Sequence, residues 1–276
     1  MSDENVLTKE IAEQFLVDVD SVDLSEFTAI EDGAAESLSK HKGALSLDGL
    51  TILSDGPGHI ALAEKLSKQG DLYLYDLTSL SDTAAKSLSK HKGSLHLQSL
   101  TSLSDAVAES LSKHEGHLSL DSLTSLSDAA AESLSKHESD LYLYSITSLS
   151  DAAAESLSQH EGELWLNGLT ELSDAAAESL SKHGDTLNLR SLTSLSDAAA
   201  ESLSKHKSDL YLYSITSLSD AAAESLSKHE CHLSLDSLTS LSDAAAESLS
   251  KRQNVNIFLD NLPASAAKIL RDAGHG

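Results

Sequence analysis

The sequence is poor in the residues that cross-link a fold and in basic side chains. Its 276 residues include one cysteine, Cys231, and two prolines. A single cysteine excludes an intrachain disulfide and a cysteine-based zinc site. Nineteen lysines and arginines face 44 acidic residues, which gives a formal net charge of −25. Such a surface repels nucleic-acid phosphates and anionic lipid headgroups, so we expect no nucleic-acid or membrane partner, whereas cationic partners are attracted.

Signals for export and for membrane insertion are also missing from the sequence as written. The first residues, MSDENVLTKEIAEQF, contain neither a basic region nor an apolar stretch of the kind that forms a signal peptide. No uninterrupted apolar run approaches the ~20 residues of a membrane span. We therefore expect a soluble, cytoplasmic chain.

The sequence is, by contrast, highly repetitive. Hydrophobic residues make up 40% of the chain, enough to build a core. One aspartate recurs every 23 residues, except for a step of 27 between Asp55 and Asp82 that includes the insertion GPGH. The recurring positions are Asp32, Asp55, Asp82, Asp105, Asp128, Asp151, Asp174, Asp197, Asp220 and Asp243. Self-similarity at this period predicts an array of stacked repeats.

Each repeat combines two periodicities, best seen in DLYLYSITSLSDAAAESLS, which occurs unchanged at residues 140–158 and 209–227. Leu141 and Leu143 alternate with tyrosines, which predicts a short strand with one buried face. The pair Ser150-Asp151 is typical of a helix start, and AAAESLS supplies strong helix formers. A strand and a short helix cannot bury a core alone, so the pattern predicts a solenoid with a parallel sheet on one side.

These repeats resemble the leucine-rich repeat family in their L-x-L strand and D-x-x-A-x-x-L helix. The sequence LTSLSDAAAESLSKH is similar to short repeat arrays in planctomycete proteins. The resemblance implies a right-handed α/β solenoid, with a parallel sheet on the concave face, short helices on the convex face, and a protein or peptide partner bound on the sheet. One departure is clear. The family's asparagine position holds a leucine or isoleucine here, so we expect the adjoining threonines, such as Thr51 and Thr78, to satisfy the turn.

We expect residues 1–276 to form one repeat domain. A capping helix over residues 8–17 lies within an N-terminal cap, 1–21, and about eleven strand–helix repeats follow over 22–262. Ile257, Leu259 and Leu262 carry the last predicted strand pattern, and Pro263 ends it. Residues 263–276 then supply a C-terminal cap, since a solenoid needs polar caps at its ends.

Aromatic residues are rare but concentrated. All six tyrosines and the only tryptophan occupy strand positions that alternate with the buried leucines, which we call the outward face. Tyr and Trp are enriched at binding hot spots, and acidic residues precede several of these strands. The candidate ligand-binding residues are Tyr73, Tyr75, Tyr142, Tyr144, Trp165, Tyr211, Tyr213, Asp71, Asp140 and Asp209.

Three functions fit the outward face. The first is a non-catalytic interaction module for a protein or peptide, with a basic peptide as the charge-complementary case. The second is a carbohydrate-binding module that stacks sugar rings on the same aromatic residues. The third is a structural spacer, because aromatic residues also pack across strands and a copied three-repeat block explains their spacing.

Histidines provide the remaining candidates. Eight occupy one repeat position just after the helix: His41, His91, His114, His137, His160, His183, His206 and His229. We interpret them as helix C-terminal caps whose protonation near pH 6 lowers the negative charge along one edge. His117 and His232, which precede strands, are weak metal candidates explained by duplication. Since no hydrolase, P-loop or zinc-protease motif occurs, we predict no catalytic residue, metal ligand or cofactor.

Overall fold

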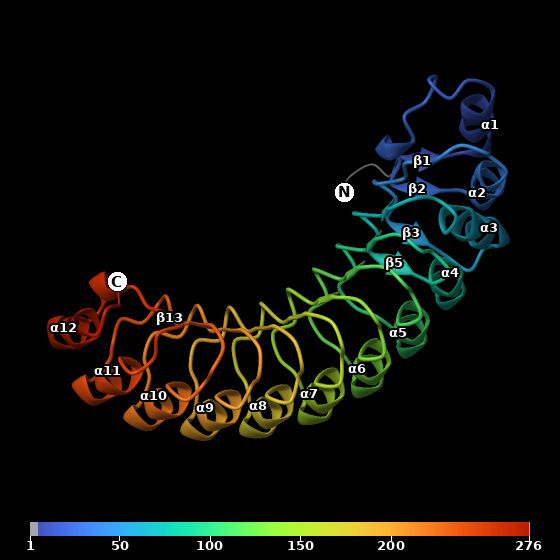
Figure 1. Cartoon of the computed structure of the whole chain (residues 1–276). Helices are drawn as coiled ribbons and strands as arrows, with labels where there is room; N and C mark the ends of the chain where they lie inside the picture. The colour runs from blue at the N-terminus through green and yellow to red at the C-terminus, as the bar shows by residue number, and fades with distance from the viewer. Residues whose placement is uncertain (1–4, 276) are drawn as a thin grey trace. The chain divides into compact units, whose positions relative to one another are not determined.

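The computed structural model describes residues 5–275 and divides them into two compact units. The first contains residues 5–123 and 136–142, and the second contains residues 124–135 and 143–275. In each unit the helices lie side by side on one side of the strands (Figure 1). Residues 1–4 of the expected N-terminal cap, and Gly276 at the end of the C-terminal cap, lie outside the described part.

Parallel strands of two residues each form the sheets. In the first unit β4 (Leu72–Tyr73), β6 (Leu95–His96), β7 (Leu118–Ser119) and β8 (Leu141–Tyr142) pair in that order. Two further pairs are β1 (Val6–Leu7) with β2 (Ala29–Ile30) and β3 (Ile52–Leu53) with β5 (Ser79–Leu80). The second unit orders β9 (Leu164–Trp165), β10 (Leu187–Asn188), β11 (Leu210–Tyr211), β12 (Leu233–Ser234) and β13 (Val255–Asn256).

Short helices alternate with these strands along the chain. The first unit holds α1 (Lys9–Val17), α2 (Asp32–Ser39), α3 (Pro57–Leu66), α4 (Asp82–Leu88) and α5 (Asp105–Leu111). The second holds α6 (Asp128–Leu134), α7 (Asp151–Leu157), α8 (Asp174–Leu180), α9 (Asp197–Leu203), α10 (Asp220–Leu226), α11 (Asp243–Leu249) and α12 (Ala264–Asp272). The predicted α/β repeat solenoid with a parallel sheet is confirmed.

The core lies between the strands and the helices. Within one repeat, Leu164 and Leu166 from the strand and Ala176, Ala177 and Leu180 from the helix are fully buried. Alanine at the helix positions lets neighbouring helices approach closely, and each buried leucine contributes roughly 1.5–3 kcal/mol. The two periodicities read from the sequence therefore correspond to the two faces of this core.

A serine caps each regular helix from α4 to α11, and six of these serines also join their helix to the preceding repeat. Ser150 Oγ accepts the N–H of Ala153 at 2.9 Å and donates to Asp128 Oδ1 at 2.5 Å. The same serine–aspartate link joins Ser104 to Asp82, Ser173 to Asp151, Ser196 to Asp174, Ser219 to Asp197 and Ser242 to Asp220. The serine is thus the N-cap, worth about 1 kcal/mol, and the aspartate holds the cap of the next repeat.

Threonines satisfy the turn that follows the strand, as the sequence predicts. Thr51 donates to the Thr28 carbonyl from both its hydroxyl, at 2.8 Å, and its backbone N–H, at 2.9 Å. Equivalent hydroxyl bonds join Thr78 to Thr51, Thr193 to Thr170 and Thr239 to Thr216. A threonine-to-carbonyl link from one repeat to the next is therefore made by the residue after the position at which the resembling family has asparagine.

The insertion GPGH lengthens α3 to ten residues and changes how its first turn is capped. Asp32 Oδ1 accepts the backbone N–H groups of Gly58 at 2.8 Å and His59 at 3.3 Å. The buried His59 accepts the Ser54 N–H at Nδ1, so its other nitrogen carries the proton and donates to the Ile30 carbonyl, 3.1 Å away. An aspartate from the preceding helix thus replaces the serine cap.

Two predicted strands are wrong. Residues 45–48 form no strand, because the side-chain amide of Gln69 accepts the Leu45 N–H at 2.6 Å and donates to the Leu45 carbonyl at 3.2 Å. The last strand is Val255–Asn256 in place of Ile257 to Leu259, since it pairs with Leu233–Ser234. This register makes Asn256 and Phe258 its alternating outward residues, whereas residues 259–261 form a 3-10 helix.

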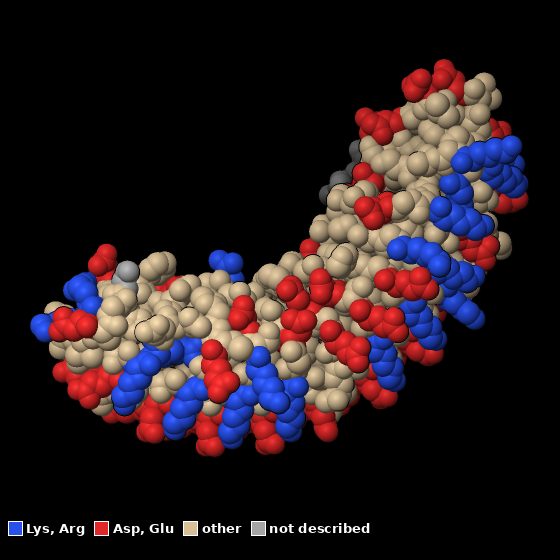
Figure 2. Space-filling view, viewed as in Figure 1, with Lys and Arg blue, Asp and Glu red and all other residues tan. Residues whose placement is uncertain are grey.

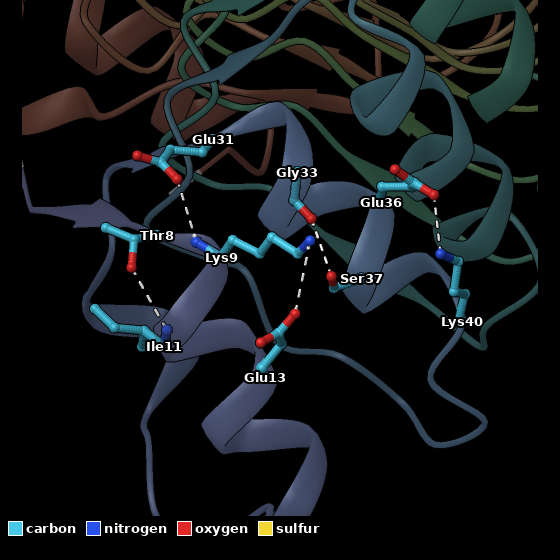
Figure 3. A network of polar contacts seen from close by, with 9 residues as sticks. All are labelled: Thr8, Lys9, Ile11, Glu13, Glu31, Gly33, Glu36, Ser37 and Lys40. Atoms are coloured by element: carbon cyan, nitrogen blue, oxygen red, sulfur yellow. Dashed lines mark hydrogen bonds and ion pairs between the residues drawn. The ribbon is translucent and has the colours of Figure 1, made fainter.

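Polar contacts fix α1 beside α2 (Figure 3). Thr8 caps α1 by accepting the Ile11 N–H, and Glu31 accepts the backbone N–H of Lys9 at 3.2 Å. The Glu31 carboxylate therefore lies at the positive end of the α1 dipole, where a negative charge is favourable. Lys9 also forms an exposed ion pair with Glu13 at 3.7 Å, which contributes little.

Gly58→Ala tests the close approach of α2 and α3. A Cβ on Gly58 would lie 1.9 Å from the Asp32 carbonyl oxygen, so the helices must separate. We expect a loss of about 1–3 kcal/mol in the free energy of unfolding, measured by urea denaturation followed by circular dichroism. Gly70→Ala is the matched control, because its Cβ meets no atom within 4 Å. Equal stability of the two variants would contradict the close-approach assignment.

Candidate functional site

In the first unit the candidate tyrosines form a compact aromatic cluster with a histidine. Tyr73 and Tyr75 have ring centroids 5.3 Å apart, and the His96 ring stacks on Tyr73 at 4.9 Å and 17°. His96 belongs to the cluster because β6 lies beside β4, with Tyr73 and His96 in register. Tyr73 and Tyr75 are 39% and 38% exposed, so both rings are available to a partner. We call these three residues the first cluster.

Carboxylates lie around the first cluster. Asp71 Oδ1 accepts the Ser94 N–H at 2.9 Å, and this hydrogen bond holds the pKa of Asp71 below its usual value. The pKa of Tyr75 is raised by partial burial and then by Tyr73 and Asp48. The cluster therefore presents the neutral phenol of Tyr75 near the ionised carboxylate of Asp71 at neutral pH.

The second unit repeats the motif with an added cation. The rings of Tyr211 and Tyr213 stack at 5.6 Å and 8°, and His232 lies 5.6 Å from Tyr211. The guanidinium carbon of Arg190 lies 5.2 Å from the centroid of the Tyr213 ring, within cation–π range. These four residues are called the second cluster.

The remaining candidates lie elsewhere on the strands. Trp165 on β9 donates from Nε1 to Glu163 Oε2 at 3.0 Å, and its ring meets that of Tyr144 edge-on at 5.9 Å. Tyr142 lies on β8, and the Asp140 carboxylate just before that strand is 3.6 Å from Nδ1 of His117. Glu163 also acts electrostatically on Tyr211, which connects Trp165 to the second cluster.

Part of the aromatic surface serves the sheet itself. Tyr211 is in register between Asn188 and Ser234, and these two small residues are 5% and 0% exposed. Ser119, in register with Tyr142, is 7% exposed. At these positions large rings therefore also pack over small neighbours in the sheet. Tyr73 and Tyr75 differ, because they are exposed whereas the other four tyrosines and Trp165 are half-buried.

Two predicted acidic residues also have a structural role. Asp209 Oδ1 accepts the His232 N–H at 3.1 Å, as Asp71 accepts that of Ser94. Each carboxylate thereby links its repeat to the next one. Sequence reasoning did not assign His96, His232, Asp48 or Arg190 to the site, although aligning the repeats places Asp48 and Arg190 one repeat before Tyr75 and Tyr213.

Most histidines that follow the helices are buried and stack on one another within each unit, and for four of them the interpretation as titrating caps is wrong. Seven of them are 1–2% exposed: His91, His114, His137, His160, His183, His206 and His229. In the first unit the rings of His91 and His114 are 5.6 Å apart at an angle of 2°. In the second unit successive rings from His160 to His229 are 6.3–6.4 Å apart and nearly parallel. We call these residues the histidine stack.

Backbone carbonyls face the stacked rings. The nitrogens of His91 lie 3.3 Å from the Ser67 and Ser94 carbonyl oxygens. Other side chains occupy the same repeat position near the ends of the array. Gln69 binds Leu45, as described above, and the buried Arg252 donates to the carbonyls of Cys231 and Asn254. At this position Gln69, His91 and Arg252 therefore all direct polar groups to backbone atoms.

Burial favours the neutral form of four of these imidazoles. It lowers the pKa of His183 to about 4, with neighbouring His160 and His206 adding to the effect. Burial is also the main cause that lowers the pKa of His114, His206 and His229. The predicted loss of negative charge near pH 6 is therefore moved to lower pH at these four residues. Within residues 5–275 no group of three or more His, Cys, Asp or Glu is placed to hold a metal ion.

The comparisons with known proteins give only distant likeness. No family model matches the sequence, and no curated protein matches it. Among solved structures, an internalin (inlF) from Listeria monocytogenes is 15% identical with a TM-score of 0.40, covering 97% of this chain and 93% of that one. The functional domain of InlJ from the same organism, which includes a cysteine ladder, is 15% identical with a TM-score of 0.32, covering 80% and 54%. The fold assignment therefore rests on the strands and helices described above.

The structure adds one finding on membranes. Among the described residues, no helix has the length and apolar character needed to cross a bilayer.

The histidine stack predicts a loss of stability in acid. Because the pKa of His183 is lower folded than unfolded, its contribution is complete above about pH 6.5 and is lost as pH falls toward 4. For His183 alone the loss is about 3 kcal/mol by linkage. We expect His183→Gln, which introduces the side chain that Gln69 has at this repeat position, to flatten the fall of the melting temperature between pH 7 and pH 4. His117→Gln, which changes an exposed histidine, is the control, and equal slopes for both variants would contradict the prediction.

Proposed function

We propose that the chain is a non-catalytic interaction module that binds a protein or peptide on its outward face. The observation that carries this proposal is the placement of all six tyrosines and the only tryptophan at outward strand positions. Tyr and Trp bury a large area at a low cost in side-chain entropy, which is why they dominate binding hot spots. The candidate residues remain Tyr73, Tyr75, Tyr142, Tyr144, Trp165, Tyr211, Tyr213, Asp71, Asp140 and Asp209.

The charge distribution supports a basic partner. On the helix side lysines pair with glutamates one turn earlier, as in Lys113–Glu109, Lys205–Glu201 and Lys228–Glu224. Figure 2 shows Lys and Arg side chains gathered along the helix side, next to Asp and Glu. The outward strand positions, by contrast, include one basic residue, Arg190, among several aspartates. A partner with exposed Lys or Arg would therefore find complementary charge on the outward face.

We also propose that the whole of residues 1–276 works as one capped repeat array. α1 lies beside α2, and α12 lies beside α11, so each terminal helix covers the end of its unit's helix row. Terminal elements of this kind keep a stacked core from being exposed.

Tyr142→Ala combined with Tyr211→Ala tests the proposed binding face. We expect the double variant to retain its fold by circular dichroism and to lose at least tenfold in affinity for partners captured by the wild-type protein. Glu178→Ala with Glu201→Ala is the matched control, because both lie on the exposed helix side. If the tyrosine variant captures every partner as well as the wild type does, the outward face is not the binding surface.

Trp165 fluorescence separates the candidate ligand classes. Titration with a basic peptide is expected to give a saturable change that weakens as salt is raised, since screening reduces the attraction between charges. Saturation by a glycan with no dependence on salt would identify a carbohydrate-binding module instead. A flat response to both, together with unchanged capture by the tyrosine variant, would favour a structural spacer.

A further inference from the structure

The second cluster contains its own cation. Arg190 lies one repeat before Tyr213 at the same outward strand position, and its guanidinium lies 5.2 Å from the Tyr213 ring centroid. The chain thereby demonstrates that a guanidinium can dock on the second tyrosine of a Tyr-x-Tyr pair. Such contacts contribute about 0.5–1 kcal/mol when exposed and more when shielded from water, a factor of roughly 2–5 or above in affinity.

The first cluster carries the opposite charge at the equivalent position. Asp48 lies one repeat before Tyr75, where Arg190 lies before Tyr213. Its proximity is reflected in the pKa of Tyr75, which is raised by partial burial and by the charges of Tyr73 and Asp48. The backbone also joins the two repeats, because the Asp76 N–H donates to the Asp48 carbonyl at 3.2 Å. The first cluster is therefore an aromatic surface beside a carboxylate, in place of an aromatic surface covered by an arginine.

We infer that the first cluster binds an arginine side chain of the protein partner, with the guanidinium over the Tyr75 ring and its charge balanced by Asp48. This inference rests on the proposed function and adds the chemistry of recognition. Arginine fits better than lysine, because its planar guanidinium stacks on aromatic rings and is less strongly hydrated than an ammonium group. The exposure of Tyr73 and Tyr75, 39% and 38%, leaves both rings accessible.

The test uses a defined probe, the capped peptide Gly-Arg-Gly, and follows the tyrosine ring signals by NMR. The matched probe is Gly-citrulline-Gly, which has nearly the same shape but no charge. We expect the arginine peptide to shift the Tyr73 and Tyr75 signals with at least fivefold higher affinity than the citrulline peptide. Equal affinity of the two peptides would overturn the inference.

Charge exchange at one repeat position provides the second arm. Asp48→Arg should place a guanidinium on Tyr75 as Arg190 does on Tyr213, and so abolish the peptide shifts at the first cluster. Asp236→Arg changes the net charge equally, but it follows Tyr213 in the array and should leave those shifts intact. Equal weakening by both variants would mean long-range charge alone and would overturn the docking geometry. Asp48→Asn, which adds no bulk, should weaken binding severalfold if Asp48→Arg does not fold.

Opening the second cluster is the converse experiment. Arg190→Asp should uncover Tyr213, and the arginine peptide should then shift the Tyr211 and Tyr213 signals as well. Absence of new shifts would contradict the role of Arg190 as an internal ligand. If Tyr73→Ala with Tyr75→Ala removes partner capture while Asp48→Arg does not, the proposed function stands and the arginine inference fails.

Discussion

Parallel hydrogen bonding between strands of successive repeats is the constraint on which the rest of the structure depends. Each strand contributes only two residues, so pairing of Leu187 with Leu164 and Leu210 fixes a register but supplies little stability alone. The register brings every residue opposite the same position of the next repeat. The same register is maintained across the rest of the repeat by serine–aspartate links, threonine–carbonyl links and stacked histidines. The leucine and alanine side chains pack between the strands and the helices.

Equivalent side chains of successive repeats lie next to one another, and this restricts which polar side chains a repeat can bury. Two ionised groups at the same position would repel one another at every step, so the histidines must stay neutral, and burial lowers the pKa of His183 to about 4 accordingly. At six aspartates the charge instead accepts a hydrogen bond from a serine of the next repeat, as Asp128 does from Ser150. Exceptions occur at irregular places: Gln69 follows the lengthened helix α3, and Arg252 follows the last regular helix.

The outward face escapes this restriction, because its side chains need not fill a closed core. Variation is concentrated there, and the structure divides it into rings that cover small neighbours, such as Tyr211 over Ser234, and rings that remain exposed, such as Tyr73 and Tyr75. We therefore expect recognition by this protein to depend on a few outward residues of particular repeats. The repeated sequence around these residues maintains the scaffold.

The sequence alone determined the repeat, the alternation of strand and helix, the buried leucines and the outward tyrosines, because these follow from periodicity within one repeat. It did not determine the strand at Val255 or the missing strand at Leu45, since each depends on which groups of another repeat lie within hydrogen-bonding reach. Nor did it determine the burial of His183, whose ring is stacked between those of His160 and His206. The docking of Arg190 on Tyr213 was likewise decided by tertiary structure. Residues 23 apart in sequence become neighbours only when the strands pair.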